Sequence, residues 1–168
     1  NRGEILGLRG PNGAGKSSLL WAIQGAGSKH AGRISSTEKT PITLVPQTAG
    51  DLLFLESVEA ELAESDRLNN AEPGATRALL QSLVGEIDLH LHPHDLSAGQ
   101  QLSLALSVQL VNGGSVLLLD EPTSALDNKN AESVIELLTS ITRANNASLI
   151  VVTHDHRWNQ AISHTIKL

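Results

Sequence analysis

The sequence predicts an α/β protein in which helices flank a mostly parallel β-sheet. Continuous apolar segments of strand length alternate with longer segments of helical periodicity, a pattern typical of strands that are buried on both faces. A glycine-rich turn at residues 10–15 joins the first expected strand directly to the first expected helix.

The expected elements follow in order along the chain. Strands are expected at Glu4–Arg9, Gly32–Ser35, Ile42–Val45, Val116–Asp120, Leu149–Thr153 and His164–Leu168. Helices are expected at Lys16–Gln24, Ser57–Glu64, Thr76–Val84, Ser97–Val111 and Asn130–Ala144. Gly25 and Gly27 mark the end of the first helix, and Ser97 is suited to cap the start of the fourth.

The 168 residues are expected to form one domain. Its core would consist of residues 1–50 and 112–168. Residues 51–111 would form a small helical subdomain, because two helical segments there are joined by the polar stretch Asp66–Gly74. The chain enters its first strand almost at once, which suggests an excised fragment.

The composition weighs against several functional classes. The chain has no cysteine, which excludes disulfides and thiolate metal sites. A formal net charge of −6 and the lack of a basic stripe count against a nucleic-acid partner. No apolar run approaches the ~20 residues that cross a bilayer.

Residues 10–18, GPNGAGKSS, carry the strongest chemical signal and match the P-loop pattern G-x-x-x-x-G-K-[ST]. Glycines let successive backbone N–H groups point at one phosphate, and the helix N-terminus adds partial positive charge. Lys16 would reach the β- and γ-phosphates, and the Ser17 hydroxyl would bind Mg²⁺. The fold is thus expected to be that of a P-loop NTPase, with phosphate-binding residues Asn12, Gly13, Ala14, Gly15, Lys16, Ser17 and Ser18.

Two acidic residues that follow the apolar segment 116–119 are a second indication of phosphate chemistry. Asp120 would join the Mg²⁺ shell, and Glu121 would polarise an attacking water. Without the P-loop, an ordinary acidic turn would explain these two residues as well.

Further motifs resemble those of ABC ATPases. Residues 96–100, LSAGQ, resemble the LSGGQ signature, and Ser124–Asp127 resembles the D-loop. Gln47 is similar to the Q-loop glutamine, and His154 to the switch histidine. The motifs occur in the family's order over nearly the whole chain.

The resemblance implies a head-to-tail dimer of two such domains, with ATP held between the P-loop of one copy and the signature motif of the other. Ser97 and Gly99 would therefore act in trans. Gln47 would join the Mg²⁺ shell and sense an integral membrane subunit. His154 would contact the γ-phosphate, and Glu121 would activate water. Catalysis is thus expected to rest on Glu121, His154 and Lys16, and Mg²⁺ binding on Ser17, Gln47 and Asp120.

The stretch Asp51–Ala63 is similar to its counterpart in energy-coupling-factor ATPases, which drive uptake of vitamins or of cobalt and nickel ions. A generic helical segment with one apolar face would explain the same stretch.

The chain departs from the family at several points. The family starts about 25 residues earlier, with antiparallel strands and an aromatic residue that stacks on adenine, so the N-terminal β-subdomain is expected to be truncated. Ala98 replaces a signature glycine, and the arginine that the family usually has near the position of Ser103 is absent. These changes weaken the expected trans contact and leave the P-loop intact.

Three functions are consistent with these motifs. The first is the ATP-hydrolysing subunit of a membrane importer at the cytoplasmic face of the membrane. The second is a soluble ABC ATPase that acts on nucleic acid or the ribosome. The third is a degenerate ATP-binding half of an asymmetric pair.

Other polar clusters have simpler explanations. His90, His92 and His94 resemble a metal tract, but an exposed loop explains them better. His154, Asp155 and His156 also suggest a metal site, less strongly than a switch histidine. Glu56, Glu59, Glu61 and Glu64 are expected to form a solvated helix face.

Overall fold

The computed structural model describes residues 3–27, 32–34, 42–111, 116–144 and 147–168. Its five strands form one sheet of order β2-β3-β4-β1-β5. They are β1 (Ile5–Arg9), β2 (Ile42–Val45), β3 (Val116–Asp120), β4 (Ser148–Val152) and β5 (His164–Lys167). Every pair of neighbours is parallel, which confirms the expected fold class.

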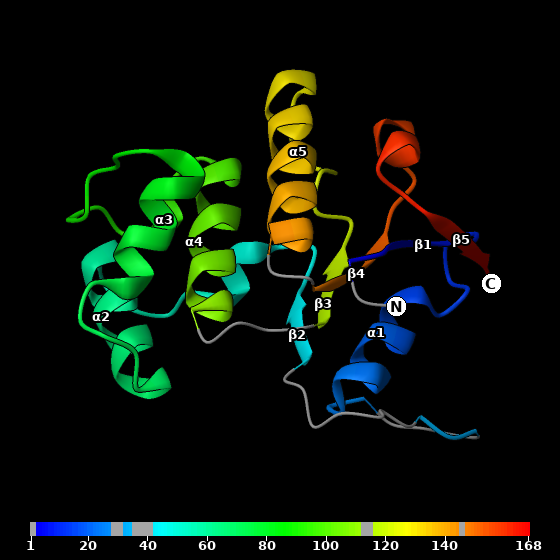
Figure 1. Cartoon of the computed structure of the whole chain (residues 1–168), viewed down its shortest axis with the longest axis horizontal. Coiled ribbons are helices and arrows are strands. Elements are labelled where there is room, and N and C mark those ends of the chain that lie inside the picture. Colours follow the sequence, from blue (N-terminus) through cyan, green and yellow to red (C-terminus); the bar gives the residue numbers. More distant parts are fainter. Residues whose placement is uncertain (1–2, 28–31, 35–41, 112–115, 145–146) are drawn as a thin grey trace.

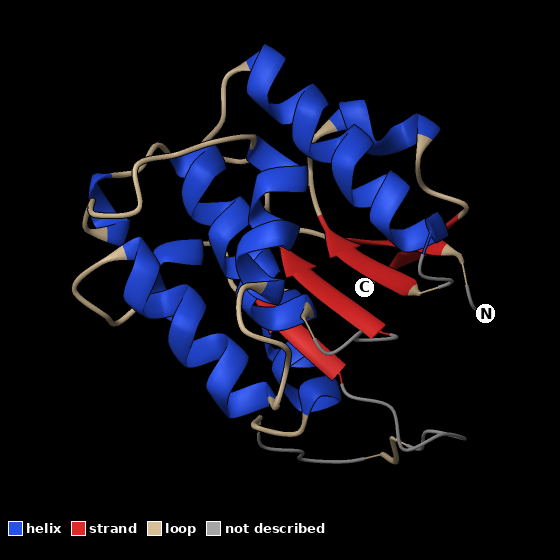
Figure 2. Cartoon of the chain, turned by 60° about the vertical axis from the view of Figure 1, so that its left-hand side comes forward, coloured by secondary structure: helices blue, strands red, loops and turns tan. Residues whose placement is uncertain are grey.

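Helices surround this sheet. The α-helices are α1 (Lys16–Gln24), α2 (Val58–Asn69), α3 (Ala75–Val84), α4 (Ala98–Leu110) and α5 (Asn128–Ala144). Short 3₁₀ helices are η1 (Ala49–Leu52), η2 (Pro93–Asp95) and η3 (His156–Gln160). Figure 1 shows α1 and α5 on opposite faces of the sheet, and α2, α3 and α4 beyond its β2 edge. The parallel strands are seen between these layers in Figure 2. No helix of the described ranges has the length and apolar character needed to cross a membrane.

Alternate residues of the strands pack into two separate hydrophobic cores, one on each face of the sheet. On β3, Leu117 and Leu119 pack toward α4 and α5, whereas Leu118 packs with Leu20 of α1 on the other face. This two-sided burial explains why the strands read as unbroken apolar runs. Helix α4 also belongs to a third cluster, formed with α2 and α3, so it joins the helical group to the sheet.

Helix α2 continues to Asn69, beyond the expected end at Glu64 and into the stretch Asp66–Gly74 that was expected only to join two helices. Two further expectations about local structure are wrong. Residues 32–34 of the expected strand at Gly32–Ser35 have no strand structure, and Ser35 lies outside the described residues. Gly32 has a left-handed φ of 90°, which a strand does not adopt.

The second concerns Glu61, which is buried rather than solvated, with only 6% of its surface exposed. Its carboxylate accepts hydrogen bonds from the backbone N–H groups of Phe54 and Leu55. A buried carboxylate needs such partners, so Glu61 ties α2 to the segment that follows η1.

Candidate nucleotide-binding site

The carboxyl ends of β1, β2, β3 and β4 open on one pocket of about 630 Å³. Parallel strands release their following segments at the same edge of a sheet, which is where such folds bind ligands. The lining residues are Asn12, Gly13, Gly15, Lys16, Ser17, Ser18, Gln47, Asp120, Glu121, Ser124, Val152 and His154. The structure thereby brings together every residue expected to act within one copy except Ala14.

The P-loop has the backbone shape that an anion site needs. Gly13 and Gly15 adopt left-handed φ values of 82° and 87°, a conformation that favours glycine. Helix α1 begins at Lys16 without a side-chain cap, so its first N–H groups remain available to an anion.

Lys16 supplies the positive charge of this pocket. Its side chain is folded over the loop, with Nζ donating to the carbonyl oxygens of Gly10 at 2.9 Å and Pro11 at 3.1 Å. An ammonium group has three donors, so one remains for a ligand.

Glu121 and His154 face each other at the end of β3 and β4. His154 Nε2 lies 3.6 Å from Glu121 Oε1, and the His154 backbone N–H donates to Glu121 Oε2 at 3.3 Å. Glu121 itself has a left-handed φ of 49°, which is uncommon for a residue with a side chain. Its N–H donates to the Val152 carbonyl at 2.9 Å, which holds this conformation.

The pocket also offers ligands suited to Mg²⁺. The Ser17 hydroxyl, the Gln47 side-chain carbonyl and the Asp120 carboxylate all line it. Mg²⁺ prefers oxygen ligands and keeps several waters, so few protein groups suffice. These residues therefore fit the ion. Gln47 follows the end of β2, and Asp120 is the last residue of β3.

The histidine-rich tract shows no metal geometry. His90 Nδ1 lies 4.0 Å from Glu59 Oε2, and the rings of His92 and His94 are 5.3 Å apart. No group of three or more His, Cys, Asp or Glu side chains is arranged to hold a metal within the part of the chain that the structure describes.

Ser97 and Gly99 lie apart from the phosphate pocket. They line a different hollow of about 280 Å³ between α3, α4 and α5. Ser97 caps α4: its hydroxyl accepts from the Gln100 N–H at 3.4 Å, and its own N–H donates to Gln100 Oε1 at 3.0 Å. An added Cβ on Gly99 would meet no atom within 4 Å.

A polar network behind the pocket has no signature in the sequence. Asp155 accepts hydrogen bonds from Thr123 and Arg157. The pKa of the Asp155 carboxyl is lowered to about 2, mainly by its side-chain hydrogen bonds with Arg157. The partners are 32 and 2 residues away from Asp155 in sequence, so only the fold reveals the full set.

Comparison with known proteins agrees with this architecture. The family model described as "ABC transporter" matches residues 1–124. An ABC transporter ATP-binding protein of Streptomyces coelicolor is 39% identical over 99% of this chain and 31% of its own length. The methionine import ATP-binding protein MetN of Bartonella henselae is 33% identical over 98% of the chain and 53% of its own length. The macrolide export protein MacB of Marinobacter nauticus is 31% identical over 91% of the chain and 26% of its own length.

Solved structures share the fold. A metal-chelate type ABC transporter in an inward-facing conformation matches with a TM-score of 0.83 and 27% identity, over all of this chain and 69% of its own. The protein cbiO1 from Clostridium perfringens, part of the ABC transporter complex cbiONQ, matches with a TM-score of 0.76 and 28% identity, over 92% of this chain and 68% of its own. The chain spans from about a quarter to about half of the length of the curated relatives described above. It belongs to the ABC transporter family as an ATP-binding domain.

Proposed function

We propose that this chain binds and hydrolyses ATP and couples that reaction to transport through separate membrane subunits. The observation that carries this proposal is the single pocket shared by the P-loop, Gln47, Asp120, Glu121 and His154. Each of these groups suits one part of phosphoryl transfer, and they derive from four different strand ends.

ATP would place its phosphates against the P-loop. The N–H groups at the start of α1 and the ammonium of Lys16 would neutralise the β- and γ-phosphate charge. Ser17, Gln47 and Asp120 would hold Mg²⁺, which supplies further charge neutralisation when it is bound.

Glu121 would accept a proton from the attacking water. Its side chain is 18% exposed and lines the same pocket as Lys16. His154, at 52% exposure, is accessible to a γ-phosphate. The contact between the two side chains places the base beside the group that would detect the phosphate.

A second copy or a paralogous domain would complete the site in trans. Ser97 and Gly99 line a separate hollow and are not among the residues that line the phosphate pocket of their own copy. The Ser97 cap occupies the Gln100 N–H at the start of α4, and the other N–H groups of this first turn would serve an anion, which supports the head-to-tail dimer.

The membrane partner would dock on the segment that follows Gln47. Phe54 in that segment is 82% exposed, so its ring would be available to an apolar group of the partner. This docking would place the chain at the cytoplasmic face of the membrane. We propose further that the transporter is an importer of the energy-coupling-factor type. This part of the proposal rests on the similarity of residues 51–63 and on the likeness to cbiO1.

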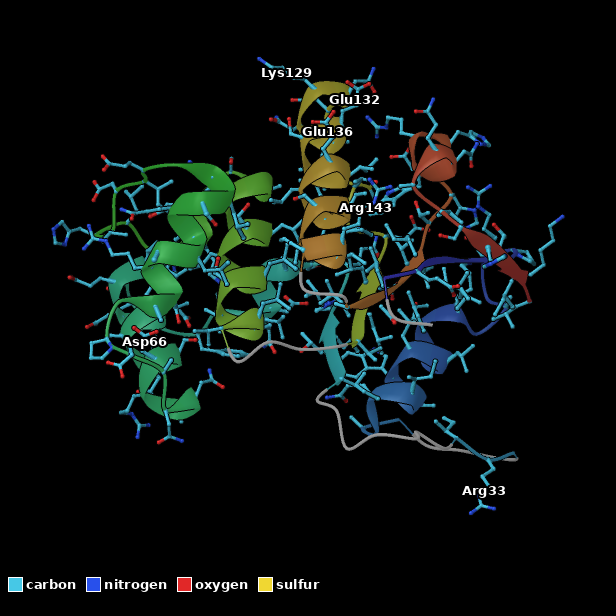
Figure 3. The ribbon with its side chains drawn as sticks, viewed as in Figure 1. Arg33, Asp66, Lys129, Glu132, Glu136 and Arg143 are labelled. Atoms are coloured by element: carbon cyan, nitrogen blue, oxygen red, sulfur yellow. The ribbon has the colours of Figure 1, made fainter. Side chains whose placement is uncertain are left out.

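ATPase activity of the full-length protein, assembled with its membrane subunit, tests this function. Glu121→Gln is expected to lower kcat by roughly a hundredfold or more while ATP still binds. Lys16→Ala is expected to abolish ATP binding. Glu136→Gln and Arg143→Ala are matched controls on α5, where Figure 3 shows both side chains.

Wild-type protein without ATPase activity in its complex would refute hydrolysis and leave the asymmetric, ATP-binding-only reading. Unchanged binding in Lys16→Ala would refute the P-loop assignment. Uptake of substrate into vesicles, rather than efflux, would support import.

A further inference from the structure

Two segments that follow neighbouring strands are joined behind the phosphate pocket. One is the 121–127 loop, which follows β3 and carries Glu121. The other is the 153–158 segment, which follows β4 and carries His154. Thr123 from the first and Trp158 from the second are buried, with 2% and 0% of their surface exposed.

Asp155 lies at the centre of the contact. Its Oδ2 accepts from the Thr123 hydroxyl at 2.8 Å. Its two oxygens accept from Arg157 Nε at 2.9 Å each, and Arg157 Nη2 lies 2.7 Å from Oδ2. This paired geometry between a guanidinium and a carboxylate fixes orientation as well as distance. The Thr123 oxygen in turn accepts from Trp158 Nε1 at 3.3 Å.

Arg157 also reaches the other end of the loop. Its Nη1 donates to Asn128 Oδ1 at 2.9 Å, and Asn128 is the first residue of α5. The 121–127 loop is therefore held near its start through Thr123 and just beyond its end through Asn128. Both attachments lead to Arg157, and lysine could not make them together because it lacks the planar fork.

We propose that Thr123, Asp155, Arg157 and Asn128 form a clamp that holds the 121–127 loop and His154 as one unit, and that Arg157 and Thr123 are thereby positioning residues for ATP hydrolysis. This inference rests on the proposed function. Glu121 and His154 lie at the two clamped segments, and their mutual contact requires both segments to keep their spacing. A shift of about 1 Å in a reacting group can lower a rate by roughly a hundredfold.

The clamp also bears on the neighbouring surface. Ser124 of the clamped loop lines the phosphate pocket and, with Gln47 and Ala98, an adjacent pocket of about 260 Å³. A fixed loop therefore keeps a constant spacing between the phosphate pocket and the start of α4.

Steady-state ATPase kinetics of the full-length protein in its complex form the first test. Thr123→Val keeps the shape of the side chain and removes its hydroxyl, so kcat is expected to fall roughly tenfold or more with KM for ATP nearly unchanged. Thr123→Ser restores the hydroxyl and is expected to restore kcat. Arg157→Lys is expected to behave like Thr123→Val.

Arg67→Lys is the matched control, because Arg67 makes a similar fork with Glu64 on the exposed face of α2. It should leave kcat unchanged. If Thr123→Val and Arg157→Lys retain the wild-type kcat, or if Thr123→Ser is as slow as Thr123→Val, the positioning role is wrong.

Hydrogen exchange provides a second test that needs no activity. Arg157→Lys is expected to speed exchange at the amides of Ser124 and Leu126, whose bonds lie within the 121–127 loop. Faster exchange confined to residues 153–158 would overturn the clamp. If wild-type protein is inactive but Arg157→Lys still speeds exchange at Ser124 and Leu126, the proposed hydrolysis is refuted and the clamp stands.

Discussion

At the scale of single residues, Asp155 links the site to the stability of the fold. Its carboxyl has a pKa of about 2 in the folded chain, against 3.8 as the ordinary value, chiefly because Arg157 stabilises the carboxylate. A lowered pKa means that the stabilisation is complete above the unfolded value. It is lost as the pH falls from about 4 through about 2.

We therefore expect Asp155→Asn to lower the free energy of unfolding by about 2 kcal/mol near pH 6. The difference from wild type should shrink as the pH approaches about 2, because the wild-type carboxyl then becomes protonated. Urea unfolding across this pH range, followed by tryptophan fluorescence, measures the effect.

A difference that stays constant across the pH range would show that ionisation of Asp155 does not stabilise the fold. Glu64→Gln serves as the comparison. The pKa of Glu64 is also lowered, by its hydrogen bond with Arg67, but that pair is exposed and screened by solvent.

At the scale of elements, helix α2 is fixed by two buried carboxylates. Glu61 binds the backbone of Phe54 and Leu55, and Asp66 accepts from the N–H groups of Gly74 at 2.6 Å and Thr76 at 2.9 Å. Figure 3 shows Asp66 among the helices of this group. The two carboxylates thus connect α2 to the segment before it and to the start of α3.

Glu61→Ala is expected to lower the free energy of unfolding by about 2 kcal/mol, because the backbone N–H groups of Phe54 and Leu55 lose their acceptor. Glu59→Ala is the matched control, since Glu59 is on the same helix with its side chain exposed. Thermal or urea unfolding measures the stability of the two variants against that of the wild type. Equal stability of both would mean that water satisfies the freed N–H groups.

The strands were predicted closely because each one is an apolar run ended by polar or glycine residues. Val116–Asp120 agrees in full, and the β4 prediction differs by one residue at each end. The P-loop helix was predicted without error because its glycines set both of its ends. These signals are local, so a single sequence displays them.

The misses at Glu61 and Arg157 are non-local. Glu61 was expected to be solvated because it belongs to a series of glutamates that is typical of a charged helix face. Its burial depends on the segment after η1, whose backbone donates to its carboxylate. Arg157 carries no motif, and its partner Asn128 is 29 residues away. The contact of Arg157 with Asn128 follows from the packing of β3 beside β4, which no short pattern encodes.

At the scale of the whole molecule, the phosphate pocket and the start of α4 are separate surfaces. The proposed dimer would bring one against the other across two copies. Gly99 tests this arrangement, because a side chain there has room in a single chain but would meet the partner's nucleotide.

We expect Glu121→Gln protein to form a dimer when ATP is added, as measured by light scattering after size-exclusion chromatography. Adding Gly99→Asp should prevent that dimer while ATP binding and thermal stability persist. Gly27→Ala provides the contrast. Its Cβ would lie 2.7 Å from the Ala22 nitrogen, so that variant should lose stability. A dimer that survives Gly99→Asp would contradict the head-to-tail arrangement.

The left-handed backbone of Glu121 has a consequence for how such domains diverge. Glycine suits that φ of 49° better than glutamate does, so the residue proposed to activate water occupies a position where the backbone favours its loss. A single base change converts a glutamate codon to glycine. A descendant of this domain that binds the nucleotide without hydrolysing it is therefore one substitution away. Only selection for ATP hydrolysis keeps the carboxylate in place.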